Sequence, residues 1–365
     1  MARHNAHNER IKREYLIFLK EAKRLSDPSV DNAAAALHRF EASNGFKDFR
    51  QFHRQQAVAF KRRLTEEKNE RTGKPLSKAT VHSVLAALKA FVQWLAGRPG
   101  FKSRINYSDA EYFNLTDKET REARTHTERS VPTLGQIKHV LGVMPAITEI
   151  ERRNHALIAF TLLTGARDGA IVSLKLKHID LVEGRIMQDA REVRTKFSKS
   201  FPTYFFPVGN DVCQIVQAWV DFLRAEKLWS NDDPLFPATK VSQGNNQQFR
   251  ASGLARKHWS TASPIRDIFR KAFEHAGLPY FHPHSFRDTL TQLGEQICRT
   301  PEEFKAWSQN VGHEKVMTTF ASYGAVATTR QAVIIRRLSN PVEPDIPSEE
   351  LVEKIRQIVA RQPSD

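Results

Sequence analysis

The sequence predicts a mainly α-helical protein with one small antiparallel β-sheet, divided into two domains. Three observations support this fold class. Apolar residues recur at helical spacing through most of residues 8–96. A polar stretch with little apolar periodicity follows at residues 101–130. β-forming residues then gather between His178 and Val208, inside a region that is otherwise helical. The 365 residues suffice for two cores, since a domain takes roughly 150 residues.

Four helices are predicted in the first domain, at residues 8–24, 31–43, 50–67 and 77–96. Asp31 is the candidate N-cap of the second helix, and Gly45 ends it. The last helix has the clearest apolar stripe and stops at Gly97 and Pro99. Lys and Arg are abundant on the exposed faces of the first three helices, so this domain is expected to be helical and basic.

The second domain is predicted to begin near Val131. Thr133 caps its first helix, another helix at residues 152–164 ends at Gly165, and Arg167 opens the next. Residues 178–208 form a small three-stranded sheet, and helices follow at 211–226, 264–276, 284–297 and 301–311. Thr300 and Glu303 are placed as a capping box. The predicted organisation is therefore 1–113 helical domain, 114–130 irregular linker, 131–340 second domain and 341–365 tail.

The tail combines a proline-rich tether with a short amphipathic segment. Pro341, Pro344 and Pro347 favour an extended chain. Residues 349–361 then place Leu351, Ile355, Ile358 and Val359 on one helical face. A helix of about three turns is marginal alone in water, so this stripe is expected to need a partner surface.

Charge and cysteine content restrict the class of protein. The formal net charge is +15 and the pI about 9.8, which attracts polyanions, so nucleic acid is the default partner. On charge alone a ribosome-associated basic protein fits equally well. Cys213 and Cys298 are the two cysteines and give neither a disulfide framework nor zinc spacing. Residues 1–23 lack a secretory apolar core, and no apolar run of about 18 residues occurs. We expect a cytoplasmic protein without a membrane partner.

One group of residues has the chemistry of a phosphate site. His284 and Arg287 are spaced about one helical turn apart, so both can reach a single phosphodiester. Gly312-His313 and Tyr323 follow, and upstream Arg167 comes directly after Thr164-Gly165-Ala166. His282 and His284 flank Pro283, but further ligands at metal spacing are lacking, so no metal is expected.

These motifs, in this order, resemble the tyrosine recombinase family, also called phage-type integrases. The resemblance implies a mixed α+β catalytic domain after a helical domain that clamps DNA. It also implies that Arg167 and Arg287 hold the scissile phosphate, that His284 assists Tyr323, and that His313 donates to a phosphate oxygen. Tyr323 is then the nucleophile of a 3′-phosphotyrosine link, without a metal or other cofactor.

The family's catalytic lysine, which protonates the leaving 5′ oxygen, has two candidates. The segment from Arg194 to Lys199 lies among β-forming residues and resembles the hairpin that carries this lysine. Lys196 is the first choice and Lys199 the second, because hairpin register is not readable from sequence.

The chain departs from the family pattern at two points. Ala170 stands where the family usually has an acidic residue, and Asp168 is a candidate substitute. The interval from His313 to Tyr323 is one residue longer than the commonest one, yet Tyr323 is the only tyrosine after Tyr280.

By this resemblance the protein is expected to be a site-specific recombinase or integrase of a mobile genetic element. It would act on double-stranded DNA as a homo-oligomer, a tetramer on paired sites, with accessory DNA-bending proteins as further partners. When bound to DNA it would associate with the nucleoid. Two alternatives stay open: a type IB topoisomerase-like enzyme that relaxes DNA, and a DNA-binding protein that keeps this fold without cleaving.

Overall fold

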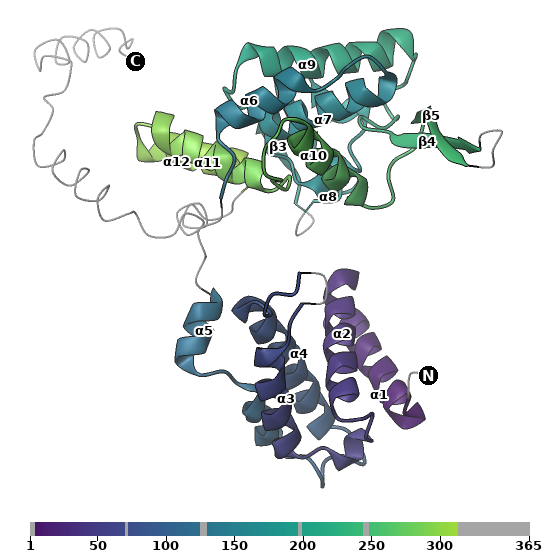
Figure 1. Ribbon diagram of the computed structural model, residues 1–365, viewed down its shortest axis with the longest axis vertical. Coiled ribbons are helices and arrows are strands. Elements are labelled where there is room, and N and C mark those ends of the chain that lie inside the picture. The colour runs from purple at the N-terminus through teal and green to yellow at the C-terminus, as the bar shows by residue number, and fades with distance from the viewer. Residues whose placement is uncertain (1–3, 70–71, 125–129, 196–198, 244–247, 313–365) are drawn as a thin grey trace, which may run out of the picture. The chain divides into compact units, whose positions relative to one another are not determined.

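The computed structural model describes residues 4–69, 72–124, 130–195, 199–243 and 248–312 (Figure 1). The chain forms two compact units, Met1–His126 and Thr127–Asp365. Each unit has its own cluster of buried apolar side chains. The division between the units falls inside residues 114–130, the segment predicted as a linker.

The first unit is a bundle of helices. They are α1 (Ala6–Ile17), which continues into a π-helical turn (Phe18–Ala22), α2 (Asp27–Ser43), α3 (Arg54–Glu66), α4 (Lys78–Ala96) and α5 (Asp117–Arg124), with 3₁₀ turns at Phe49–Gln51 and Tyr107–Phe113. The apolar stripe of α4 is buried as predicted, and the Ser77 side chain caps this helix by accepting from the Thr80 backbone N–H at 3.1 Å. Among the described residues, α4 alone is long and apolar enough to cross a membrane, and its buried stripe makes it a core helix of this unit.

Two features of this unit differ from the sequence prediction. Helix α2 begins at Asp27 instead of Asp31, because Ser26 is the N-cap and Pro28 stands in the first turn, where a missing backbone N–H leaves no hydrogen bond unmade. Helix α5 lies in the stretch predicted as an irregular linker. It packs against α4, so a strongly polar sequence becomes helical through its contact with the bundle.

The second unit is helical with two small antiparallel sheets. Its helices are α6 (Leu134–Val143), α7 (Glu149–Thr164), α8 (Asp168–Ile171), α9 (Asn210–Asp221) with a π-helical extension (Phe222–Glu226), α10 (Ser263–His275), α11 (Ser285–Ile297) and α12 (Pro301–Asn310). The three-stranded sheet of β1 (Ile179–Asp180), β2 (Arg185–Gln188) and β3 (Phe201–Tyr204) is confirmed. A further hairpin of β4 (Ala238–Gln243) and β5 (Phe249–Ala255) is not predicted by the sequence pattern.

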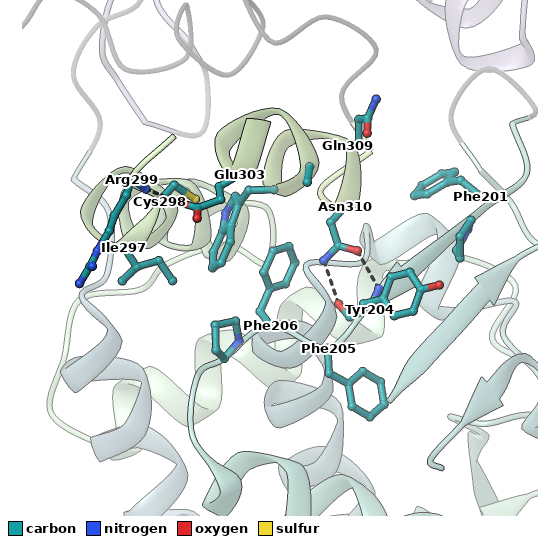
Figure 2. Close-up of a pocket in the computed structure, with 14 residues that line it drawn as sticks. Phe201, Tyr204, Phe205, Phe206, Ile297, Cys298, Arg299, Glu303, Gln309 and Asn310 are labelled. Carbon is teal, nitrogen blue, oxygen red and sulfur yellow. Dashed lines mark hydrogen bonds between the residues drawn. The ribbon is translucent and has the colours of Figure 1, made fainter. Parts of the chain in front are cut away.

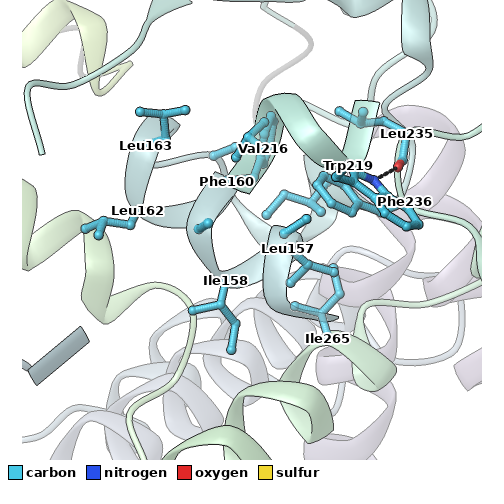
Figure 3. Close-up of a cluster of buried hydrophobic side chains, with 14 of the residues drawn as sticks. Leu157, Ile158, Phe160, Leu162, Leu163, Val216, Trp219, Leu235, Phe236 and Ile265 are labelled. Carbon is cyan, nitrogen blue, oxygen red and sulfur yellow. Dashed lines mark hydrogen bonds between the residues drawn. The ribbon is translucent and has the colours of Figure 1, made fainter. Parts of the chain in front are cut away.

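Helix α7 runs through the centre of this unit's core. Every residue from Ala156 to Thr164 is buried, and α7 packs against α9. Figure 3 shows Phe160 close to Phe236, with ring centroids 5.1 Å apart, and the Trp219 indole N–H donating to the Leu235 carbonyl at 2.9 Å. Packing around the C-terminal half of α7 therefore fixes its position, and with it the position of the turn that follows.

Candidate active site

The turn after α7 sets the position of Arg167. Gly165 has φ +59°, the left-handed conformation that glycine tolerates, and its backbone N–H donates to the Thr161 carbonyl at 2.9 Å. A Cβ at Gly165 would also meet Leu290 Cδ1 at 3.0 Å. The reversal therefore brings α7 and α11 into close contact and leaves Arg167 at the N-cap position of the short helix α8.

Arg287, on α11, is held against the same turn. Its side chain is 4% exposed. Nη1 donates to the carbonyl oxygen of Gly165 and Nη2 to that of Val311, each at 2.5 Å. Nε has no hydrogen-bond partner in the described part of the chain. Both partners are neutral carbonyls, so no carboxylate among the described residues pairs with this buried guanidinium, and Asp288 offsets its charge only at longer range.

Packing between α11 and α12 fixes the helix that carries Arg287. A Cβ on Gly294 would lie 2.5 Å from Trp307 Nε1, so only glycine lets the indole approach this closely. Trp307 donates its indole N–H to the Leu290 carbonyl at 2.9 Å and packs against Phe206, ring centroids 4.7 Å apart. The segment after β3 and both helices thus meet at Trp307.

Electrostatics mark this as a site for an anion. Burial and then the neighbouring charge of Arg167 lower the pKa of Arg287 to about 9. Burial also lowers the pKa of Arg167, whose side chain makes no hydrogen bond or ion pair with any described residue. A buried charge without a counterion is costly. Two adjacent guanidinium groups without a paired carboxylate among the described residues match the oxygens of a phosphate.

His284 lies at the edge of this pair. Protein atoms around the ring, then the charges of Arg287 and Arg167, lower its pKa to about 4, although part of the side chain remains open to solvent. The imidazole is therefore neutral at pH 7 and able to accept a proton. The neighbouring His282 has a structural role: its Nδ1 accepts the Ser285 backbone N–H at 3.2 Å at the start of α11.

Ala170, where the family usually has an acidic residue, is a packed core position in this structure. Ala170 is buried at 1% exposure, in the core of α8. Asp168 accepts from Arg266 on α10 at 2.9 and 3.0 Å, so its charge is already paired outside the arginine cluster. It still acts weakly on the site by opposing the lowering of the His284 pKa.

The segment that approaches the candidate lysines is anchored beside α8. The Arg194 backbone N–H donates to Ser173 Oγ at 2.9 Å, and its Nη1 donates to the Ser260 carbonyl at 2.9 Å. Glu192 pairs with Lys177 at 2.9 Å and with His178 at 3.3 Å. The sequence pattern did not single out Ser173, His178 or Glu192, because their role depends on contacts with residues far along the chain.

Three of the six predicted site residues are thus brought together: Arg167, His284 and Arg287. Lys196, His313 and Tyr323 lie outside the described residues, as do the prolines and amphipathic segment of the tail. Lys199, the second choice for the lysine, is described and lies just before β3.

The chain leading to His313 is fixed at Gly312, whose φ is +80° and where a Cβ would lie 2.8 Å from the Phe201 ring. Figure 2 shows the cavity beside this contact, of about 980 Å³, lined mostly by apolar side chains of β3, α12 and the turn between α11 and α12. Arg167, His284 and Arg287 do not line it. The cavity is therefore separate from the arginine pair. Among the described residues, no three His, Cys, Asp or Glu side chains are grouped as metal ligands.

Comparison with known proteins agrees with the motifs. The sequence model of the Phage integrase family matches residues 133–330. Tyrosine recombinase XerC of Lactobacillus delbrueckii subsp. bulgaricus is 23% identical over 313 residues, which cover 85% of this chain and 92% of that protein.

Two solved structures have a similar fold. A lambda integrase (75-356) dimer bound to a COC' core site superposes with a TM-score of 0.59 at 13% identity, covering 86% of this chain and 94% of that one. The Tn1549 transposon integrase in complex with transposon right end DNA gives a TM-score of 0.54 at 15% identity, covering 90% and 99%.

Proposed function

The chain belongs to the phage integrase family, the tyrosine recombinases, which cleave and rejoin DNA at specific sites through a phosphotyrosine intermediate, and we propose that it does so with Tyr323 as its nucleophile. The proposed catalytic set is Arg167, Lys196, His284, Arg287, His313 and Tyr323. The observation that carries this proposal is the pair of adjacent guanidinium groups, at the junction of α7, α8 and α11, that form no ion pair with a described residue.

In the proposed step the Tyr323 hydroxyl oxygen attacks the scissile phosphorus, and the bond from phosphorus to the 5′ oxygen breaks. Arg167 and Arg287 hold the two non-bridging oxygens and stabilise the charge that grows on them in the transition state. His284, neutral at pH 7, assists removal of the phenol proton, and His313 donates to a phosphate oxygen. Lys196 gives a proton to the leaving 5′ oxygen. The phosphotyrosine bond keeps the energy of the broken bond, so a new 5′ hydroxyl can reverse the step.

The proposed substrate is double-stranded DNA, and the proposed working form is a homotetramer on paired recombination sites. The lambda integrase dimer bound to a COC' core site and the Tn1549 integrase in complex with transposon right end DNA support a DNA partner and assembly. The helical first unit would clamp the duplex as a second contact, because a phosphate inside a duplex needs support from more than one side. Accessory DNA-bending proteins and a cytoplasmic, nucleoid-associated location complete the proposal.

Trapping the covalent intermediate tests this function. The purified protein is incubated with nicked duplexes cut from the DNA that flanks its own gene, and covalent adducts are resolved on a denaturing gel. The wild type should form an adduct. Tyr323→Phe should form none while binding the same duplexes, because only the hydroxyl is lost. Adducts that survive in Tyr323→Phe would overturn the nucleophile assignment.

The same experiment separates the alternatives. A wild type that binds DNA without any adduct would indicate a protein that has kept the fold and lost cleavage. Ala170, in place of the family's usual acidic residue, makes this alternative conceivable. Relaxation of supercoiled DNA without dependence on paired sites would indicate a topoisomerase-like enzyme. A recombinase should instead yield joined products only when two sites are present.

A further inference from the structure

The β4–β5 hairpin has no role in the core of the second unit beyond its root. Figure 1 shows it extending away from the helices of this unit. Ala238 at the root is 7% exposed, whereas Val241 is 56% exposed and the described residues from Lys240 to Ser252 on both strands are exposed wherever their burial is defined. Exposed two-stranded hairpins gain little stability from packing. Burial therefore does not explain why the chain builds it.

The root of the hairpin is firmly attached to α7 by a buried arginine. Arg153, 2% exposed, donates from Nη1 to the Pro237 carbonyl at 3.0 Å and to Thr239 Oγ1 at 2.9 Å. Its guanidinium lies 4.8 Å from the ring centroid of Trp259, directly after the hairpin. The remaining nitrogens donate to Asn154. Each nitrogen of this buried guanidinium thus has at least one partner within the unit, so the arginine orients the hairpin.

The hairpin and its return segment carry positive charge without any acidic residue. Between Asp233 and Asp267 the sequence has none, and its Lys and Arg are Lys240, Arg250, Arg256, Lys257 and Arg266. Arg256 and Arg266 pair with carboxylates outside this stretch, Asp233 and Asp168. The three others, Lys240, Arg250 and Lys257, have no ion-pair partner among the residues that the structure describes.

Strand register brings two of these unpaired cations together. Arg250 on β5 lies opposite Ser242 on β4. The register shifts between Lys240 and Val241, where Ser252 of β5 is the extra residue, so the irregularity lies on β5 and β4 keeps its alternation. Lys240 precedes Ser242 by two residues on β4, and side chains two apart on a strand share one face. One face of the ribbon therefore presents Lys240 and Arg250 with the hydroxyl of Ser242 between them.

We propose that the β4–β5 hairpin binds the phosphate backbone of duplex DNA, as a second contact of this unit away from the cleaved phosphate. This inference rests on the proposed function, because it presumes that the unit works on DNA. Unpaired cations separated by a small hydroxyl residue suit a row of phosphates. A two-stranded ribbon also has the width to enter the major groove. An interface with another copy of this chain would favour a larger apolar patch than Val241 supplies.

Salt-dependent binding of the double variant Lys240→Gln, Arg250→Gln tests the proposal. Each phosphate contact contributes roughly 0.9 to the log–log slope of affinity against salt, so losing two should lower the slope by about 1.8. On long duplexes the variant should bind more weakly than the wild type. On a short duplex that covers only the cleavage site, the two should bind equally. The thermal midpoint should be unchanged, because both side chains are exposed.

A second double variant, Lys271→Gln and Lys305→Gln, removes the same charge from exposed positions on α10 and α12 and should leave the slope on long duplexes unchanged. An equal loss in both variants would show general attraction instead of contact and would overturn the inference. So would a wild-type slope in the hairpin variant, or altered self-association without altered DNA binding. A wild type that forms adducts while the hairpin variant binds normally would retain the proposed function and remove only this inference. A wild type that does not bind DNA would overturn both.

Discussion

The guanidinium of Arg287 donates a hydrogen bond to the carbonyl oxygen of Gly165, a residue 122 positions earlier in the chain. This one contact joins the turn that presents Arg167 to the helix that presents His284. The same guanidinium also donates to the carbonyl of Val311, one residue before Gly312-His313. Arg287 therefore links three of the motifs that the sequence shows separately, and a change at this residue should act on the whole centre.

Arg287→Lys should reduce adduct formation by about 100-fold or more, because removing one positioned donor to transition-state charge has effects of that order. A lysine ammonium cannot reach both carbonyls and a phosphate oxygen in the planar geometry of the fork. The measurement is the single-turnover rate of adduct formation on a nicked duplex at saturating protein. Arg270→Lys, at an exposed ion pair with Asp267 on α10, is the matched control and should keep the wild-type rate. A wild-type rate in Arg287→Lys would remove this arginine from the centre.

Gly294→Ala should destabilise the protein by about 1–3 kcal/mol, the usual effect of forcing extra volume into a packed contact. Its Cβ would overlap the Trp307 indole, so α11 and α12 would have to separate. Gly142→Ala on α6 is the control, since nothing lies within 4 Å of a Cβ there. That change should be neutral or stabilising by up to about 1 kcal/mol, because alanine favours a helix more than glycine does. Chemical denaturation measures both. Equal stabilities of the two variants would mean that the packing at Trp307 is looser than described.

Local signals in the sequence predicted much of this fold. The capping box of Thr300 and Glu303, the cap at Thr133 and the stop at Gly165 are all confirmed, because each depends on residues a few positions apart. The β4–β5 hairpin was not predicted, since its strands are polar and exposed and lack the alternation that marks a half-buried strand. Helix α5 was not predicted for a similar reason: its eight residues contain no large apolar side chain.

The same distinction applies to the site. The spacing of His284 and Arg287 is local, so it could be read from the sequence. The contact of Arg287 with Gly165 and the anchoring of Arg194 by Ser173 join residues 122 and 21 positions apart, and no local pattern encodes either. The hypothesis that Asp168 replaces the family's acidic residue could not be evaluated from sequence alone. Only the fold shows that this carboxylate is paired with Arg266.

The pKa of His284 should be about 4 in the free protein and should rise when DNA binds. A phosphate beside Arg167 and Arg287 offsets the positive charges that disfavour the imidazolium. The folded pKa lies below the ordinary value near 6.5, so this group's contribution to stability is complete above about pH 6.5 and declines as the pH falls towards 4. Histidine NMR titration with and without DNA measures the shift. Arg167→Met should raise the pKa in the free protein, and an unchanged value would show that the two side chains do not interact.

Lys196→Ala should slow cleavage of ordinary DNA by about 100-fold or more, the typical contribution of a general acid. A substrate with a 5′-thio leaving group needs no proton, so it should recover most of that rate. The same recovery in Lys199→Ala, with none in Lys196→Ala, would move the role to Lys199.

Glu192→Gln should also slow cleavage of ordinary DNA more than cleavage of the 5′-thio substrate, but by less than Lys196→Ala does. Glu192 anchors the segment before Lys196 through Lys177 and His178, so the variant should lose about 10-fold on the oxygen substrate, a partial share of a general acid's contribution, and little on the sulfur one. Asp232→Asn is the matched control, because Asp232 pairs with Lys175 and Lys177 but lies outside this segment. Equal losses on both substrates would assign Glu192 a purely structural role.

Deleting residues 341–365 should separate DNA binding from assembly. The apolar stripe of Leu351, Ile355, Ile358 and Val359 is too short to be stable as a free helix, so it needs a surface to cover. We expect that surface to belong to the neighbouring protomer, which would tie cleavage to assembly. The truncated protein should bind a single site with near wild-type affinity but form fewer multimers on paired sites and less recombinant product, as measured by native gels and product yield. Leu351→Ser with Ile355→Ser in the full chain should reproduce the defect, whereas Gln357→Ser with Gln362→Ser should not. If the truncated protein assembles and recombines like the full chain, the tail does not couple the two processes.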